Sequence, residues 1–206
     1  MDDDDERATV SILLLGDPGC GKTTFLSAIV PTWTSRLSQG VSSPHTRLPA
    51  SSPLLRDLDQ PFPFDIRLYN RHYRFEFSDT ASPENWTLHT PDFAILCYDI
   101  SDRRSLHNAA HVWRKAVARH HVQDREEIPV MLLGLKRDLR LEEGDKRIVD
   151  PQEGYRVAQE MRCDRYAECS AVTGELMKEA MEDVARTAAK TTTEEGGTSL
   201  GGCALM

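Results

Sequence analysis

The sequence has no excess of basic residues. Its 206 residues include 25 Lys and Arg against 33 Asp and Glu, which gives a net charge of −8. Proteins that bind nucleic acids, or that are held on anionic lipid by charge alone, present a basic surface to phosphate groups. We therefore expect no nucleic-acid partner and no purely electrostatic attachment to a membrane.

Long hydrophobic runs are missing as well. The most apolar stretches, 11–15, 93–98 and 130–135, are much shorter than the roughly 20 residues that a membrane-spanning helix needs. Residues 2–6 are all acidic, whereas a secretory signal starts with basic residues and continues with apolar ones. We therefore expect neither a membrane span nor an export signal.

The cysteines lack the paired spacing of metal sites and redox motifs. There are five of them: Cys20, Cys97, Cys163, Cys169 and Cys203. Unpaired thiols are typical of a reducing compartment. The first four are predicted to be small packing residues, and the last belongs to a separate motif at the C-terminus.

The apolar pattern alternates strands with helices. With 39% hydrophobic and 28% charged residues, the chain has the composition of one folded domain. Strands are predicted at 9–15, 64–68, 73–77, 93–99, 130–135 and 165–169, and helices at 23–30, 105–121, 151–162 and 175–190. This alternation predicts an α/β fold with a mostly parallel, doubly wound sheet of about six strands between two helical layers.

Three segments fall outside this pattern. Residues 1–8 are predicted to be an acidic flexible tail, and residues 191–206 a flexible tail rich in threonine and glycine. Residues 31–63 contain many prolines and serines without apolar periodicity, so a long irregular segment is predicted there. A loop of this length inside a compact domain is usually functional. The folded domain is thus predicted to span residues 9–190.

The strongest motif lies between the first predicted strand and the first predicted helix. It fits G-x-x-x-x-G-K-[ST] and consists of Gly16, Asp17, Pro18, Gly19, Cys20, Gly21, Lys22 and Thr23, followed by Thr24. Backbone N–H groups of such a loop converge on phosphate oxygens at a helix N-terminus. Lys22 would reach the β and γ phosphates, and Thr23 would offer a hydroxyl to Mg²⁺. The sequence therefore predicts a nucleotide-binding P-loop NTPase with a three-layer sandwich fold.

Three further segments follow in order at the ends of predicted strands: Asp79-Thr80-Ala81, Gly134-Leu135-Lys136-Arg137-Asp138 and Glu168-Cys169-Ser170-Ala171. Together with the P-loop, they make the chain resemble the Ras-superfamily small GTPases over roughly residues 9–190. The likeness is greatest to the Rho branch, although the span from Asp138 to Ser170 is short for the Rho-specific helical insert.

This resemblance implies GTP or GDP as the ligand, with Mg²⁺ held by Thr23 and, through water, by Asp79. It places the remaining nucleotide-binding residues at the base: Lys136, Asp138, Leu139, Ser170 and Ala171. A carboxylate at Asp138 can accept two hydrogen bonds from the guanine edge, which is a physical reason for preferring guanine over adenine.

The departures from the family pattern concern hydrolysis. Ser82 and Pro83 stand where the family has Gly and then the Gln that orients the attacking water. Proline has no side-chain donor or acceptor and no backbone N–H, so Pro83 cannot orient a water molecule. The catalytic residue is therefore unassigned, and GTP hydrolysis is expected to be slow.

Three other positions also differ from the family. Pro18 stands at the second glycine of the P-loop, and Leu135 replaces the Asn or Thr before Lys136, which removes a polar link between base site and P-loop. The family's spacing puts the Thr that closes over Mg²⁺ near Asp57, where there is none. Thr46 is the nearest candidate downstream of Thr34, and this metal ligand is left unassigned.

These features favour a guanine-nucleotide-binding molecular switch with weak intrinsic hydrolysis. The alternative is a pseudo-GTPase scaffold that binds nucleotide weakly or not at all and acts through protein contacts. An ATP-dependent P-loop enzyme is disfavoured by Lys136, Asp138 and the Ser170-Ala171 turn. As a switch, the chain is expected to be a monomer that meets effectors and exchange factors through its switch segments.

The C-terminus carries a prenylation box. Cys203-Ala204-Leu205-Met206 fits C-a-a-X, and the final Met predicts a farnesyl group. A single lipid chain gives only marginal, reversible membrane binding. Residues 191–202 contain no Lys, Arg or second Cys to reinforce it. We therefore expect a lipid-anchored protein on the cytoplasmic face of a membrane, with a cytosolic pool.

Overall fold

The structure is a computed structural model, and it describes residues 8–29, 60–68, 71–80, 91–121, 128–141 and 147–192. Six strands form one sheet in the order β2-β3-β1-β4-β5-β6. They are β1 (Ala8–Leu15), β2 (Phe62–Leu68), β3 (Arg71–Thr80), β4 (Phe93–Asp99), β5 (Val130–Leu135) and β6 (Arg165–Glu168). Every neighbouring pair is parallel except the antiparallel β2 and β3. The predicted mostly parallel α/β sheet is confirmed.

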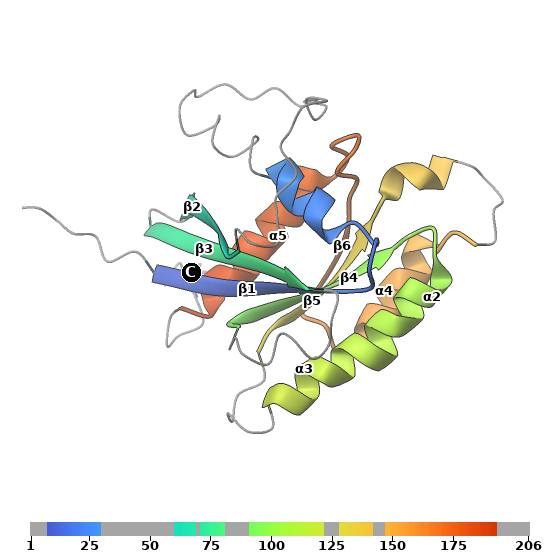
Figure 1. The fold of residues 1–206 in the computed structure, drawn as a ribbon, viewed down its shortest axis with the longest axis horizontal. Helices are drawn as coiled ribbons and strands as arrows, with labels where there is room; N and C mark the ends of the chain where they lie inside the picture. The colour runs from blue at the N-terminus through green and yellow to red at the C-terminus, as the bar shows by residue number, and fades with distance from the viewer. Residues whose placement is uncertain are drawn as a thin grey trace, which may run out of the picture.

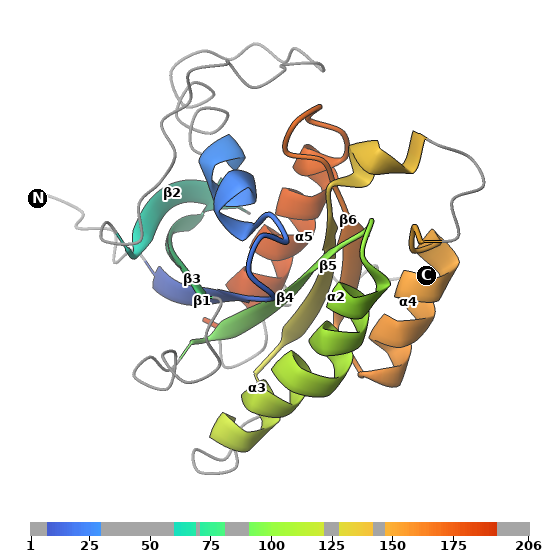
Figure 2. The same cartoon turned by 45° about the vertical axis from the view of Figure 1, so that its right-hand side comes forward.

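Helices cover both faces of this sheet. Residues 22–29 are helical, and the later helices are α2 (Arg103–Asn108), α3 (Arg114–His121), α4 (Pro151–Glu160) and α5 (Met177–Lys190). A π-helical turn, Ala109–Trp113, joins α2 to α3. Helix 22–29 and α5 lie on one face, whereas α2, α3 and α4 lie on the other (Figures 1 and 2). The molecule therefore has three layers.

The central strand β1 shows why the sheet is covered on both sides. Ile12 and Leu14 pack into the hydrophobic cluster beneath helix 22–29 and α5. Leu13 and Leu15 point the other way, into the cluster beneath α2, α3 and α4. Successive side chains of a strand face opposite sides, so a nearly continuous apolar run is buried only between two helical layers.

Several boundaries differ from the sequence-based predictions. β2 starts at Phe62 rather than at residue 64, so the predicted irregular segment 31–63 is wrong at its end. Pro63 is accommodated because β2 lies at the edge of the sheet, where a strand tolerates a residue without an N–H. Residues 30–59, which hold the rest of that segment, lie outside the described ranges.

Two helices are shorter than predicted. α5 begins at Met177 because Leu176, with φ of 54°, is in the left-handed region and cannot continue a right-handed helix. α4 ends at Glu160, shortly before Arg162, which also has a positive φ of 56°. The predicted starts and ends thus missed two local breaks that neither glycine nor proline marks.

Four cysteines, Cys20, Cys97, Cys163 and Cys169, are free thiols, as predicted. Burial raises the pKa of each thiol above its ordinary value, and that of Cys163 to about 12. These thiols therefore stay neutral and pack as small apolar groups. No helix in the described part of the chain is long and apolar enough to cross a membrane.

Candidate nucleotide-binding site

The predicted site residues lie at one edge of the sheet. The P-loop follows β1, Asp79 stands near the end of β3, Lys136 follows β5, and Ser170 follows β6. Because these four strands are parallel, their carboxyl ends meet at the same edge (Figure 1). Open α/β sheets bind ligands at this edge.

The glycines of the P-loop allow a close turn of the backbone. A Cβ atom at Gly16 would lie 2.5 Å from the carbonyl oxygen of Cys97 in β4, so only glycine fits there. Gly19 and Gly21 have φ of +75° and +111°, in the region that favours glycine. Between them lies Cys20, which is buried, whereas Pro18 is exposed.

Lys22 is folded into the loop itself. Its side chain is buried, and Nζ donates hydrogen bonds to the carbonyl oxygens of Gly16 at 2.8 Å and Asp17 at 3.0 Å. The ammonium group thereby holds a fixed positive charge among the P-loop carbonyls. This placement fits a phosphate group bound over the loop.

Thr23 and Asp79 form a pair of oxygen donors. Thr23 Oγ1 lies in the first turn of helix 22–29 and donates to Asp79 Oδ2 at 2.8 Å. The next residue, Thr24, is exposed. A hydroxyl and a carboxylate are the oxygen ligands that Mg²⁺ prefers, and here they come from the P-loop helix and the neighbouring strand. The pair fits a Mg²⁺ ion beside a bound phosphate.

Gln60 also holds Asp79, although no motif in the sequence includes Gln60. Gln60 Nε2 donates to Asp79 Oδ1 at 2.6 Å and to the Asp79 carbonyl at 3.2 Å, while Asp79 N donates to Gln60 Oε1 at 3.1 Å. The β2–β3 register, with Phe62 opposite Phe77, places Gln60 opposite Asp79. The Gln60 side chain thus continues the ladder past Pro61, which has no N–H to offer.

The Asp17 carboxylate is held by two side chains from the α2–α3 segment. Asn108 Nδ2 donates to Asp17 Oδ2 at 2.7 Å, and Trp113 Nε1 donates to Asp17 Oδ1 at 2.9 Å. Both donors flank or end the π-helical turn, a feature that often marks functional positions. Trp113 is buried, and a buried indole N–H calls for an acceptor, which the Asp17 carboxylate supplies.

The base-side residues are joined to one another. Ser170 Oγ donates to Asp138 Oδ1 at 2.5 Å and accepts from Thr173 N at 3.1 Å. Ala171 is buried beside Ser170, whereas Leu139 is exposed. The loops after β5 and β6 therefore present one fixed carboxylate, Asp138, at the sheet edge.

Lys136 connects this base side to the P-loop. Its Nζ donates to the Gly19 carbonyl at 2.7 Å and to Asp99 Oδ2 at 2.6 Å. Leu135 is buried, and its side chain lies 3.6 Å from the position that a Cβ of Gly21 would take. The polar link that Leu135 cannot make is thus made by Lys136.

A buried polar cluster supports the two base-side loops from below. Glu168 at the end of β6 receives hydrogen bonds from Arg140 and Tyr166, and Tyr98 OH lies 3.0 Å from Tyr166 OH. Burial is the main cause that raises the pKa of both tyrosines far above the ordinary value. The hydrogen bond to Glu168 likewise raises the pKa of Arg140. Arg137 Nε also lies 3.6 Å from Glu168 Oε2. The cluster therefore contains one carboxylate paired with two guanidinium groups, together with two neutral phenols.

This cluster is tightly packed. A Cβ at Gly154 in α4 would clash with Tyr166 OH, and one at Gly134 would lie 2.9 Å from Tyr98 OH. The sequence shows no motif for it. Glu168 belongs to the segment Glu168-Cys169-Ser170-Ala171 that resembles the family, but only the structure shows that its carboxylate holds Arg140 and Tyr166.

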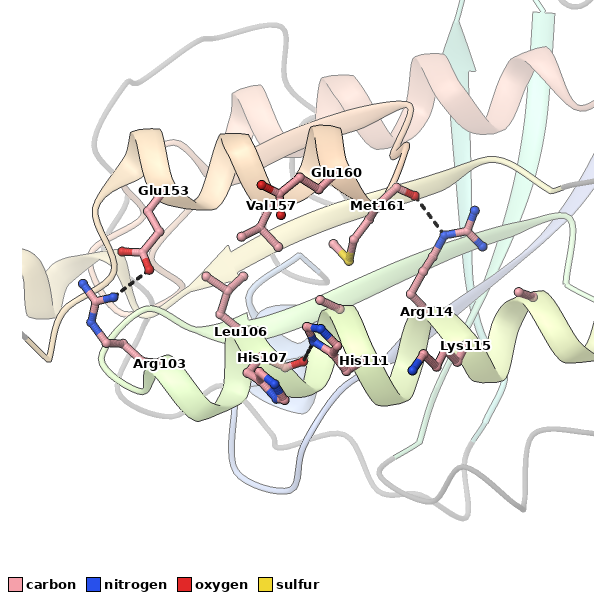
Figure 3. A pocket seen from close by; sticks show the side chains of 12 residues that line it. Arg103, Leu106, His107, His111, Arg114, Lys115, Glu153, Val157, Glu160 and Met161 are labelled. Carbon is pink, nitrogen blue, oxygen red and sulfur yellow. Dashed lines mark hydrogen bonds and ion pairs between the residues drawn. The ribbon is translucent and has the colours of Figure 1, made fainter.

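A second concave surface lies away from the nucleotide edge. A groove of about 640 Å³ runs between α2–α3 and α4, and Leu106 and Val157 point into it (Figure 3). An ion pair between Arg103 Nη1 and Glu153 Oε1, at 2.6 Å, spans one end. None of the predicted site residues lines this groove.

Other sequence-based predictions fall on residues outside the described ranges. They concern Ser82, Pro83, Thr34, Thr46, Asp57 and Cys203. The interpretations attached to them remain predictions.

Comparison with known proteins decides the family. A model of the Ras family matches residues 62–190, which is more than half of the chain. The chain belongs to the Ras family. Because the match begins in β2, the P-loop is identified by its own motif and geometry.

Curated relatives point to the Rho branch. The chain is similar to GTP-binding protein rho1 of Schizosaccharomyces pombe, at 27% identity over 86% of this chain and 85% of the relative. It is 35% identical to GTP-binding protein RHO4 of Eremothecium gossypii, over 88% of this chain and 64% of the relative. It is 30% identical to Ras-like GTP-binding protein RhoL of Drosophila melanogaster, over 59% and 65%. The predicted resemblance to a Rho-like GTPase is confirmed.

Proposed function

We propose that this Rho-like protein is a guanine-nucleotide-binding switch in which binding is retained and hydrolysis is slow. The observation that supports guanine binding is the Asp138–Ser170 pair, with 2.5 Å between Oδ1 and Oγ, on the same sheet edge as the P-loop. The names of the curated relatives, all GTP-binding proteins of the Rho or Ras-like type, agree with this ligand.

Each described side chain has a distinct task in this proposal. Asp138 accepts hydrogen bonds from the guanine edge, and the Lys136 stem covers the base. Lys22 neutralises phosphate charge, while Thr23 and Asp79 would hold Mg²⁺, which would supply further positive charge to the phosphates. Asn108 and Trp113 hold the Asp17 carboxylate in place.

A nucleotide competition experiment tests this ligand choice. A fluorescent GDP analogue is bound to the purified protein with Mg²⁺ and then displaced by GTP, GDP, ATP or ADP. Guanine nucleotides are expected to displace it at concentrations at least about a hundredfold lower than adenine nucleotides, because the Asp138 carboxylate opposes the acceptor groups of adenine. Equal displacement by ATP would contradict guanine selectivity.

Slow hydrolysis rests on Ser82 and Pro83 at the positions of the family's Gly and Gln. A Pro83 side chain cannot orient the attacking water, and we expect a weak response to activating proteins as well. In single-turnover assays, S82G/P83Q should hydrolyse bound GTP roughly tenfold faster or more than the wild type, because a Gln supplies the missing positioning. Equal rates in the two proteins would contradict this part of the proposal.

The alternative is a scaffold that does not cycle between nucleotide states. Pro18 in the P-loop and Pro83 favour it, since both depart from the pattern that serves the γ-phosphate. Nucleotide exchange distinguishes the two functions: a switch holds its nucleotide with Mg²⁺ and exchanges it when Mg²⁺ is removed, whereas a scaffold that binds nucleotide weakly or not at all holds none under either condition. In either case we propose that protein partners meet the switch segments.

We also propose reversible membrane attachment through a farnesyl group on Cys203. The support is the C-a-a-X sequence, with no basic cluster or second cysteine in residues 191–202. Wild-type protein should divide between membrane and soluble fractions of cells, and C203S should be wholly soluble. C163S is the matched control, because it replaces a cysteine that is packed within the fold. Unchanged fractionation of C203S would exclude the anchor.

A further inference from the structure

We propose that Asp99 is a positioning residue that fixes Lys136 across the P-loop and thereby compensates for the apolar Leu135. The inference rests on the proposed guanine-nucleotide function and adds a residue to which neither the motifs nor the comparisons give a role. Its basis is the bridge that Lys136 Nζ forms between Gly19 of the P-loop and Asp99 at the end of β4.

The bridge joins three segments that are distant in the sequence. Lys136 Nζ lies 2.7 Å from the Gly19 carbonyl oxygen and 2.6 Å from Asp99 Oδ2. The side chain of Lys136 is about one-third exposed and that of Asp99 is largely buried, with relative exposures of 34% and 14%. A partly buried charge pair of this geometry is screened less than one on the open surface.

Asp99 is itself held in one orientation. Its Oδ1 accepts hydrogen bonds from Ser101 N at 2.8 Å and from Ser101 Oγ at 2.7 Å. Its backbone N–H donates to Ser105 Oγ at 3.1 Å. These contacts occupy one carboxylate oxygen and leave Oδ2 directed at Lys136. The carboxylate is thus preorganised for the ammonium group.

Lys136 needs such support because its backbone is unusual. Its φ of 62° lies in the left-handed region, which costs a non-glycine residue free energy unless the surroundings fix it. Leu139 N donates to the Lys136 carbonyl at 3.0 Å and holds the main chain. At the other end of the residue, Asp99 and Gly19 hold the ammonium group. Without Asp99, only one carbonyl contact would fix the side chain that covers the base.

Leu135 explains why this chain uses the bridge. The Ras-superfamily pattern has an Asn or Thr at this position. Leu135 is instead buried against the P-loop near Gly21, and its side chain has no polar atom. A polar side chain at 135 would face the same stretch of P-loop backbone. Asp99 therefore supplies, through Lys136, a link between base loop and P-loop that residue 135 cannot supply.

The test is a rescue experiment on the full chain. Fluorescent GDP is bound with Mg²⁺, and its dissociation rate is measured for wild type, D99A, L135N and D99A/L135N. D99A should release GDP about tenfold faster, the loss expected for one charge-assisted contact. L135N in the D99A background should recover most of that loss. E160A, which removes an exposed carboxylate from α4, is the charge-matched control.

The readouts separate positioning from general destabilisation. Thermal unfolding of the nucleotide-free proteins checks that each variant folds, and D99A/L135T replaces the double variant if a buried Asn prevents folding. Release from D99A within twofold of wild type would overturn the inference. Fast release that neither L135N nor L135T slows would overturn it too, because Asp99 would then act independently of this link.

The experiment distinguishes failure of the proposed function from failure of the inference about Asp99. A wild-type protein that binds no guanine nucleotide would overturn both the proposed function and this inference. A wild type that retains GDP, with D99A behaving like the control, would overturn the inference alone.

Discussion

The two ends of the nucleotide edge are built differently. On the base side, Asp138 is bonded to Ser170, and the buried Glu168 forms an ion pair with the partly buried Arg140. On the phosphate side, Asp79 is held by Thr23 and by Gln60, a residue outside the family motifs. Three and four positions beyond Asp79, Ser82 and Pro83 stand where the family has Gly and the Gln that orients the attacking water. The residues proposed to recognise the base are thus a different set from those proposed to serve hydrolysis, and each set can be tested by itself.

The largest effect is expected from breaking the support under the base side. E168A removes the buried carboxylate that pairs with the partly buried Arg140 and with Arg137, which should lower the free energy of unfolding by about 3 kcal/mol. Denaturant unfolding measures this loss. E182A removes two solvent-accessible ion pairs of α5, with Lys178 and Arg186, and should change stability by less than about 1 kcal/mol. Equal effects of the two variants would show that the cluster does not stabilise the base side.

The next effect concerns recognition itself. D138N replaces a carboxylate that accepts two hydrogen bonds with an amide that can accept only through one atom. Affinity for GDP should fall about a hundredfold, and affinity for xanthosine diphosphate should rise, because xanthine offers a carbonyl to the new N–H donor. Competition titrations with both nucleotides measure the change in affinity for GDP relative to xanthosine diphosphate. Unchanged GDP affinity would show that Asp138 does not bind the base.

A smaller effect is expected on the phosphate side. Q60A removes the donor to Asp79 Oδ1, and loss of a partner that orients a metal ligand typically costs tenfold or more in metal affinity. The Mg²⁺ concentration that halves the rate of fluorescent GDP release should rise about tenfold, while GDP binding without Mg²⁺ stays within twofold of wild type. An equal loss under both conditions would mean that Gln60 supports the fold rather than the metal ligand.

The smallest effect is a pH dependence that arises in the base-side cluster. The pKa values of Tyr98 and Tyr166 are raised in the folded protein, so both phenols remain neutral at pH values where they ionise in the unfolded chain. Their contribution is fully present below about pH 10, the ordinary tyrosine pKa, and is lost as the pH rises above it. Unfolding at pH 8 and 10.5 should show a smaller loss of stability for Y166F than for wild type. An identical loss of stability in wild type and Y166F would show that Tyr166 does not cause the destabilisation at alkaline pH.

The sheet was predictable from the sequence, and candidate site residues could be named, because both depend on local patterns. The apolar run of β1 and the P-loop motif are each contained in fewer than ten consecutive residues. Contacts between distant segments were not predictable in this way. The bonds of Asp17 to Asn108 and Trp113 join residues more than 90 positions apart, and no motif relates them.

The same reason accounts for the missed role of Asp99. The motif shows that Leu135 removes a polar link, but only the fold brings β4 beside β5 and so places Asp99 within reach of Lys136. Gln60 was missed because its partner is set by the register of two antiparallel strands, and the first of these was predicted to begin two residues too late.

The nucleotide carried by the freshly purified wild-type protein tests the central claim most directly. Protein isolated in Mg²⁺-containing buffer is denatured, and the released nucleotides are separated and quantified against the protein. Retained binding with slow hydrolysis predicts close to one guanine nucleotide per chain, with GTP as the larger share. Protein without nucleotide, or with adenine nucleotide, would contradict retained guanine binding, and protein loaded with GDP alone would contradict slow hydrolysis.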